Sequence, residues 1–189
     1  TLLAGLDADI PSALEAVWAA AYFTVKQALF STFLSVGFAV PVAIALQSLS
    51  GFPGRRLILA LFAMPLSLPA IAAVLGVLSL FGRNGWVADL AAATGSAFRP
   101  DIYGLDGILL VHIFFNMPLT VRMLTSAFDE IPHEQFKLAE TLRFGAAARI
   151  RHVLVPAVRS VLPGIAGLVI LLCAGSYTII FVLGGGLAV

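Results

Sequence analysis

Charged residues that could do chemistry are concentrated in residues 127–156, a segment between two long apolar runs. His133 and Glu134 could begin the zinc-binding pattern H-E-x-x-H, but Lys137 stands where the second histidine would have to be. The acidic residues lie in loops or near the ends of apolar runs, away from where an intramembrane enzyme would need a carboxylate pair. We therefore expect no catalytic residue, no metal site and no bound cofactor, and a chain that is not an enzyme.

The same segment has the pattern of a docking element. Pro132 can begin a helix, which we expect to continue to Arg143. Gly145 is expected to break this helix, and a second helical run over 146–154 then leads to Pro156. A helix, a break and a helix along a membrane face suit binding by a partner protein better than a passive loop. Apolar residues share one side of the first helix, namely Phe136, Leu138, Ala139 and Leu142, and the rest is charged, namely Glu134, Lys137, Glu140 and Arg143.

Polar side chains within the apolar runs are the second group of candidates. His112 and Asn116 are four residues apart, which places them on the same face of a helix. Tyr177 belongs to a short polar interruption of the last apolar run. Polar groups are costly in lipid, so these three residues are candidates for lining a translocation pathway. Hydrogen bonding between helices is the alternative role.

The composition indicates the environment in which these residues must be positioned. Apolar residues make up 60% of the chain and charged residues 11%, and mean hydropathy is +1.04. Soluble domains usually contain about 25% charged residues. The net charge of +1 gives no indication of a nucleic-acid partner. Because lipid cannot satisfy an open backbone, we expect an all-α, multi-pass membrane protein in contact with lipid.

Four apolar segments are long enough to cross a bilayer, which requires about 20 helical residues. An external stretch, residues 1–27, precedes them and ends in an amphipathic lead-in helix that starts at Ser12. The expected spans are roughly Ala28–Leu46, Leu57–Phe81, Gly107–Phe128 and Val161–Leu183.

Lysine and arginine indicate the orientation of these spans. The loops 48–56 and 127–160 are rich in basic residues, so the positive-inside rule places them in the cytoplasm. Residues 1–25 and 82–106 then face outside. The first span therefore runs from outside to inside, and the chain begins at Thr1 without an initiator methionine. We expect a fragment from which an earlier spanning helix is missing.

The docking segment resembles the EAA loop of type I ABC importer permeases. That pattern ends in Ile-x-Leu-Pro, where this chain has Val-Leu-Val-Pro at 153–156. Ala139 stands at the second alanine of the pattern, while Lys137 stands where glutamate is usual. Leu138 replaces the first alanine, and Arg143 occupies the place of the glycine.

Further segments resemble the thiamine permeases within that family. They are GFPGRR at 51–56, FGRNGW at 81–86, YGLDGILLVHIFFNMPLTVRML at 103–124 and IPHEQ at 131–135. The resemblance implies a partial type I ABC importer permease helical bundle of about four transmembrane helices. It further implies that residues 28–186 are part of the first half of a fused, two-half permease in the bacterial inner membrane.

The resemblance also implies partners. These are an ABC ATPase subunit, a periplasmic substrate-binding protein, and a second permease half or second copy. Residues 127–156 would form the loop that couples to the ATPase, and ATP hydrolysis would reside on that partner because the G-x-x-x-x-G-K-[ST] pattern is absent here. The implied substrate is thiamine or its phosphate esters; a permease for ferric iron or another small solute, an intramembrane enzyme and a channel are the alternatives. The coupling residues would be Glu134, Lys137, Ala139, Glu140, Arg143, Gly145 and Pro156.

Overall fold

A computed structural model describes residues 2–49, 51–96 and 102–184, with side chains from residue 14 onward. The regular elements within these ranges are all helices. Arg99 and Asp101, which contribute to the predicted external loop, lie outside the described residues. So do Gly185 and Gly186 at the end of the predicted permease domain.

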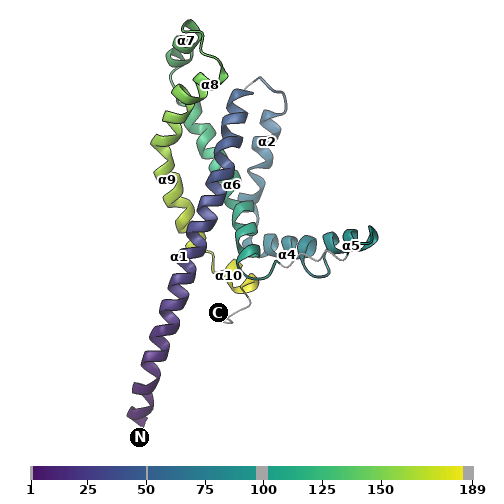
Figure 1. The fold of residues 1–189 in the computed structure, drawn as a ribbon, viewed down its shortest axis with the longest axis vertical. Coiled ribbons are helices and arrows are strands. Elements are labelled where there is room, and N and C mark those ends of the chain that lie inside the picture. Colours follow the sequence, from purple (N-terminus) through teal and green to yellow (C-terminus); the bar gives the residue numbers. More distant parts are fainter. Residues whose placement is uncertain (1, 50, 97–101, 185–189) are drawn as a thin grey trace.

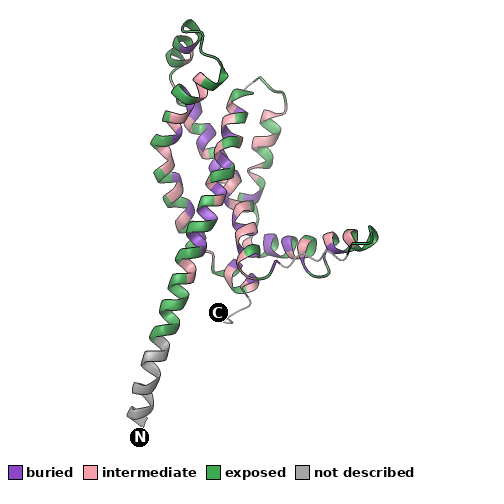
Figure 2. Cartoon of the chain, in the orientation of Figure 1, coloured by how far each residue is buried: buried purple, intermediate pink, exposed green. Residues whose placement is uncertain are grey.

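Helix α1, Leu2–Ser48, is one continuous helix of 47 residues. The predicted lead-in helix and first span are therefore parts of the same element, because no residue between them interrupts the helix. At 1.5 Å per residue it is about 70 Å long, more than twice the thickness of a bilayer core. Its N-terminal half extends away from the other helices (Figure 1), and the side chains of residues 14–22 are exposed (Figure 2).

The predicted second span, residues 57–81, is not a single helix. It is divided into α2 (Arg55–Leu61), α3 (Met64–Ser67) and α4 (Ala70–Phe81). The second break is at Leu68, whose ψ of 134° is extended. A residue that precedes a proline, here Pro69, is sterically disfavoured in the helical conformation. The chain changes direction at this hinge, so α4 and α5 (Trp86–Ala93) lie crosswise to the bundle (Figure 1).

Helix α6, Leu105–Asp129, is the centre of the bundle and confirms the predicted third span. It packs against both α1 and α9. The side of α1 that meets it carries small residues, including Ala39 and Ala43, both fully buried. Small residues let helix backbones approach closely in membranes. The buried apolar side chains of α6 include Ile108, Val111, Val121, Leu124 and Phe128.

The predicted helix, break and helix of the docking segment are confirmed, but the break is not made by Gly145. Helix α7 is His133–Thr141, and α8 is Ala146–Arg149. Arg143 makes the turn between them with a φ of 53°, whereas Gly145 is extended with a φ of −67°. A π-helical turn, Ile150–Leu154, then leads directly into the next spanning helix.

The predicted fourth span, residues 161–183, begins earlier and is interrupted. Helix α9 is Val155–Ala174, and α10 is Tyr177–Leu183. Gly175 and Ser176 separate them, and α10 turns across the N-terminal end of α6, where Gly104 N donates a hydrogen bond to Leu183 O at 2.7 Å. The segments that are long and apolar enough to cross a membrane are Leu14–Ser48, Ala70–Ala93, Leu105–Asp129 and Ala146–Ala174. The protein is therefore an all-helical membrane protein.

Candidate functional site: a buried polar cluster and an exposed docking helix

A cluster of buried polar side chains lies where α1, α6 and α9 meet. His112 and Asn116 come from α6, one helical turn apart, as the sequence predicts. Gln27 and Ser31 come from α1, and all four residues are at most 4% exposed. The third helix contributes its end, because Cys173 of α9 is followed by the break before α10.

Hydrogen-bond directions in this cluster fix the tautomer of His112. Ser176 Oγ donates to Cys173 O at 2.6 Å, so this hydroxyl can only accept from the imidazole. His112 Nε2 therefore carries the hydrogen and donates to Ser176 Oγ at 2.6 Å. His112 Nδ1 accepts from Ser31 Oγ at 2.8 Å. The neutral imidazole thus links Ser31 of α1 to Ser176, the residue immediately before α10.

Cys173 is the other centre of the cluster. Its carbonyl oxygen loses its usual helical partner, because Tyr177 N donates to Gly175 O at the end of α9. Gln27 Nε2 from α1 donates to this oxygen at 3.1 Å. Asn116 Nδ2 donates to Cys173 Sγ at 3.2 Å. Ser176 N and Oγ also donate to Cys173 O, so the end of α9 is bonded by its own chain and by side chains of α1 and α6.

A pocket of about 210 Å³ opens beside the cluster. It lies between the α3–α4 hinge, α6 and the α9–α10 break. His112, Asn116 and Ser176 supply its polar groups, and the remaining residues are apolar, namely Leu66, Leu68, Ala70, Phe115, Leu119, Leu172 and Ile179. The structure thus brings two of the three predicted pathway residues together.

Tyr177, the third predicted pathway residue, lies outside this pocket. Its side chain is 73% exposed and stacks on Phe181, with ring centroids 5.7 Å apart. The first residue of α10 is directed outward by the turn, so the tyrosine does not reach His112 or Asn116.

The α1 side of the cluster is what the sequence interpretation missed. Gln27, Ser31 and Ser35 recur every fourth residue, which places them on one face of an otherwise apolar helix. The four-residue spacing of these polar residues could have identified this face of α1 from the sequence. Four buried side-chain oxygens of α1 and α6 have no hydrogen-bond partner within the described part of the chain: Gln27 Oε1, Thr32 Oγ1, Ser35 Oγ and Thr120 Oγ1.

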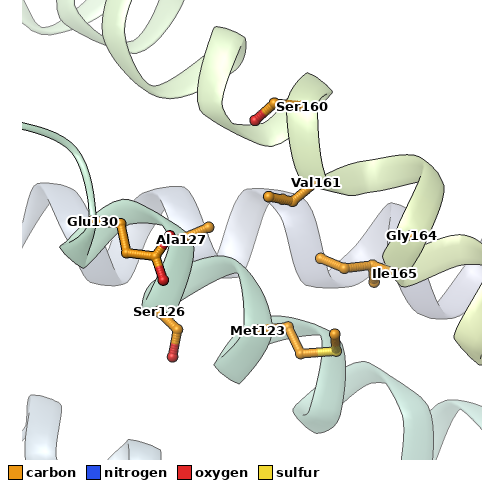
Figure 3. Close-up of a pocket in the computed structure, with 8 residues that line it drawn as sticks. All are labelled: Met123, Ser126, Ala127, Glu130, Ser160, Val161, Gly164 and Ile165. Carbon is orange, nitrogen blue, oxygen red and sulfur yellow. The ribbon is translucent and has the colours of Figure 1, made fainter.

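The C-terminal half of α6 has an open groove on each side. Between α6 and α9 there is a pocket of about 480 Å³, lined by Met123, Ser126, Ala127, Glu130, Ser160, Val161, Gly164 and Ile165 (Figure 3). Between α6 and α3 there is another of about 470 Å³. Both include Met123 and Ser126, so this face of α6 is uncovered in the single chain.

Helix α7 is the second candidate site. Ala139 is buried, and Phe136 packs against the core, so these residues attach the helix to the molecule. Leu138 and Leu142 face away and are 59% and 56% exposed. The charged residues predicted for coupling are exposed around them, namely Glu134, Lys137, Glu140 and Arg143. An exposed apolar pair with charges around it is compatible with the apolar centre and polar rim of a protein contact.

The turn after α7 depends on Arg143. Its N–H donates to Glu140 O at 2.9 Å, and Phe144 N donates to Ala139 O at 2.8 Å. A left-handed conformation is unfavourable for a residue with a Cβ atom. The EAA pattern has glycine at this position, so the structure explains that preference. Gly145 is exposed just after the turn, and Pro156 lies in the first turn of α9, outside the α7–α8 region.

An ion pair and a hydrogen bond of Arg55 join α2 to the C-terminal ends of α6 and α1. Arg55 Nη2, at the start of α2, is 3.6 Å from Asp129 Oδ1 at the end of α6. The same nitrogen donates to Gln47 Oε1 of α1 at 3.4 Å. Asp129 is four residues before His133, so this contact lies close to the start of α7.

Comparison with known proteins identifies close relatives. The chain is 52% identical over 170 residues to the thiamine transport system permease protein ThiP of Brucella abortus, which covers 90% of the chain and 31% of that protein. For the ThiP of Escherichia coli the identity is 42%, covering 90% and 32%. The sulfate transport system permease protein CysW of Synechocystis is 30% identical over 136 residues, covering 72% and 45%. No family model matches. The chain spans about a third of the length of the thiamine permeases it matches.

Proposed function

We propose, from the homology of this chain to the thiamine transport system permease proteins over nine tenths of its length, that it forms part of the membrane-spanning permease of an ATP-driven importer in the bacterial inner membrane. The observation that carries this proposal is the 52% identity over 170 residues with a thiamine permease. The spanning helices and the exposed α7 supply what a permease needs, namely a membrane bundle and a place for a motor protein.

The proposed substrate is thiamine or its phosphate esters. The similarity to thiamine permeases is higher and extends over more of the chain than the similarity to the sulfate permease. Cells with and without the intact gene would be compared for uptake of labelled thiamine, labelled sulfate and ferric iron. We expect loss of thiamine uptake alone. Uptake of sulfate or iron that depends on the gene, with unchanged thiamine uptake, would replace the proposed substrate.

Helix α7 is proposed to insert into a groove of a separate ATPase subunit, which hydrolyses ATP. Leu138 and Leu142 would fill an apolar part of that groove, and the surrounding charges would fix the orientation. Ala139 and Phe136 hold the helix on the bundle, and the turn at Arg143 sets the angle of the chain that leaves it.

The test is co-purification of the ATPase with the full-length permease. Leu138→Asp and Leu142→Asp together are expected to reduce recovered ATPase about tenfold or more, as loss of central apolar contacts does at protein interfaces. The matched control is Leu49→Asp, an exposed leucine at the same end of the bundle that lies outside α7. Equal recovery of the ATPase with the unsubstituted permease, the double variant and the Leu49→Asp control would refute the docking role of α7.

The remaining partners follow from the same proposal. The uncovered face of α6, with Met123 and Ser126, is where a second permease half or second copy would close the pathway. His112 and Asn116 would line that pathway at the pocket beside the cluster, and Tyr177 would stand at its outer end. A periplasmic substrate-binding protein would contact the outer loops.

A further inference from the structure

The polypeptide from α2 to α4 follows α6 step by step toward its outer end. Arg55 pairs with Asp129, the last residue of α6. Leu59 and Ala60 then line a pocket with Thr125. Each further contact of the α2–α4 segment is closer to the beginning of α6.

The remaining contacts complete this path. Leu66 and Ser67 share a pocket with Leu119. Val74 and Val77 belong to one buried cluster with Ile108 and Val111, near the first residue of α6. The segment 55–77 has therefore crossed the whole length of α6, which is about 37 Å.

The rest of α4 and all of α5 have no membrane left to cross. If Ala70–Ala93 spanned the bilayer, its end would return to the side of Arg55. Only residues 94–104 would then remain to reach the start of α6 on the opposite side. Eleven residues can span that distance only as extended chain, and an extended backbone in lipid leaves its polar groups unsatisfied.

The exposed side chains of this arm are nevertheless apolar. Trp86 is 74% exposed and Leu90 is 69% exposed, and further exposed residues are Ile71, Leu75 and Leu80. Arg83 and Asp89 are its charged residues. A surface of this kind is not expected to face water alone.

Aromatic residues mark the level at which the arm lies. All five tryptophan and tyrosine residues of the chain lie on the side away from the basic loops: Trp18 and Tyr22 in the projecting half of α1, Trp86 in the arm, Tyr103 before α6 and Tyr177 at the start of α10. Such residues are enriched where a membrane meets water. Arg83 lies over the Tyr103 ring at 5.2 Å, a contact that suits the headgroup region.

We propose that residues 75–93 of the α4–α5 arm are an interfacial element, which lies parallel to the membrane in the headgroup region of the outer leaflet. Its occupant is lipid: Leu75, Leu80, Trp86 and Leu90 contact acyl chains, while Arg83 and Asp89 stay at the headgroups. The arm would hold the α3–α4 hinge, and with it the pocket beside His112, at a fixed depth. This inference rests on the membrane topology and not on the identity of the transported solute.

Trp86 fluorescence provides the first test, in the full-length permease with its other tryptophans, including Trp18, replaced by phenylalanine and reconstituted in vesicles of brominated phosphatidylcholine. We expect stronger loss of fluorescence with bromines near the carbonyl end of the acyl chain than with bromines near the methyl end. Strongest quenching by the deep bromines would overturn the proposal, and so would quenching by acrylamide without quenching by any brominated lipid.

Spin-label depth provides the second test. Ser79→Cys and Ala92→Cys, each in a background without other cysteines, are 13 residues apart. An interfacial arm gives both labels the same depth, whereas a spanning helix separates them by about 20 Å. The control pair on α6, Ile113→Cys and Ser126→Cys, has the same spacing and must show that separation. A comparable separation within the arm would overturn the proposal.

Discussion

Arg143 is a residue whose backbone conformation conflicts with its side chain. It closes the turn after α7 at a φ of 53°. Arg143→Gly is therefore expected to stabilise the protein by about 1 kcal/mol, because glycine adopts the left-handed region without steric cost. Thermal unfolding in detergent, converted to a free energy of unfolding at the midpoint, measures the difference.

Gly145→Ala is the control for this substitution. Gly145 has an allowed φ of −67° and open space where a Cβ atom would be. We expect a change within about 0.5 kcal/mol, as for ordinary surface substitutions. A large loss with Gly145→Ala and no gain with Arg143→Gly would contradict the observed turn.

His112 should make Ser31 and Ser176 energetically dependent on each other. Ser31→Ala and Ser176→Ala each remove one partner of the imidazole, at about 0.6 to 1.7 kcal/mol per hydrogen bond in a membrane protein. Because both bonds hold the same ring and tautomer, the double variant is expected to lose less than the sum of the two. Unfolding midpoints of the four proteins provide the coupling energy. If the losses of the two single variants added up to the loss of the double variant, the two hydrogen bonds would not be coupled through the His112 ring.

Helix α1 provides the prediction at the scale of elements. Ala39 is fully buried where α1 meets its neighbours, so Ala39→Leu must force the helices apart. Overpacking of this kind typically costs about 1–3 kcal/mol. Ala45→Leu adds the same side chain to an exposed position of α1 and should leave the unfolding midpoint nearly unchanged. Equal effects of the two substitutions would show that this face of α1 is not packed as described.

How well each element could be predicted depended on what determines it. Helix α6 and the helices at 133–154 follow from local pattern, since periodicity, Pro132 and the polar break lie within the segment itself. Hydropathy alone could not show whether the lead-in helix and the first span form one helix or two, because it does not detect helix continuity. The break at Leu68 has a local cause in Pro69, but the change of direction that follows it, like the break at Gly175–Ser176, accompanies the packing of α4 and α10 against α6 and each other.

Orientation is a property of the whole molecule. The basic residues Arg55, Arg56 and Lys137 are at the end where α1 ends and α2 begins, so this end is expected in the cytoplasm. In the full-length permease without other cysteines, a membrane-impermeant maleimide applied to spheroplasts should label Thr94→Cys and spare Phe52→Cys. Lysed cells should show labelling of both. The reverse pattern in spheroplasts would invert the topology.

The sequence alone determined that this protein is a helical membrane protein with a short charged helix between its last two apolar runs. These properties depend on composition and on local periodicity. In lipid, backbone N–H and C=O groups must be hydrogen-bonded within the protein, so long apolar segments form helices. It also placed His112 and Asn116 on one face of one helix.

Only the tertiary structure decided which groups that face meets. Whether Gln27, Ser31 and Cys173 surround His112 depends on the rotation and register of separate helices, and a shift of one residue turns a helical side chain by about 100°. For the same reason, only the packed structure shows that the chain has already crossed the length of α6 at Val77, and that the apolar α4–α5 arm lies across the bundle.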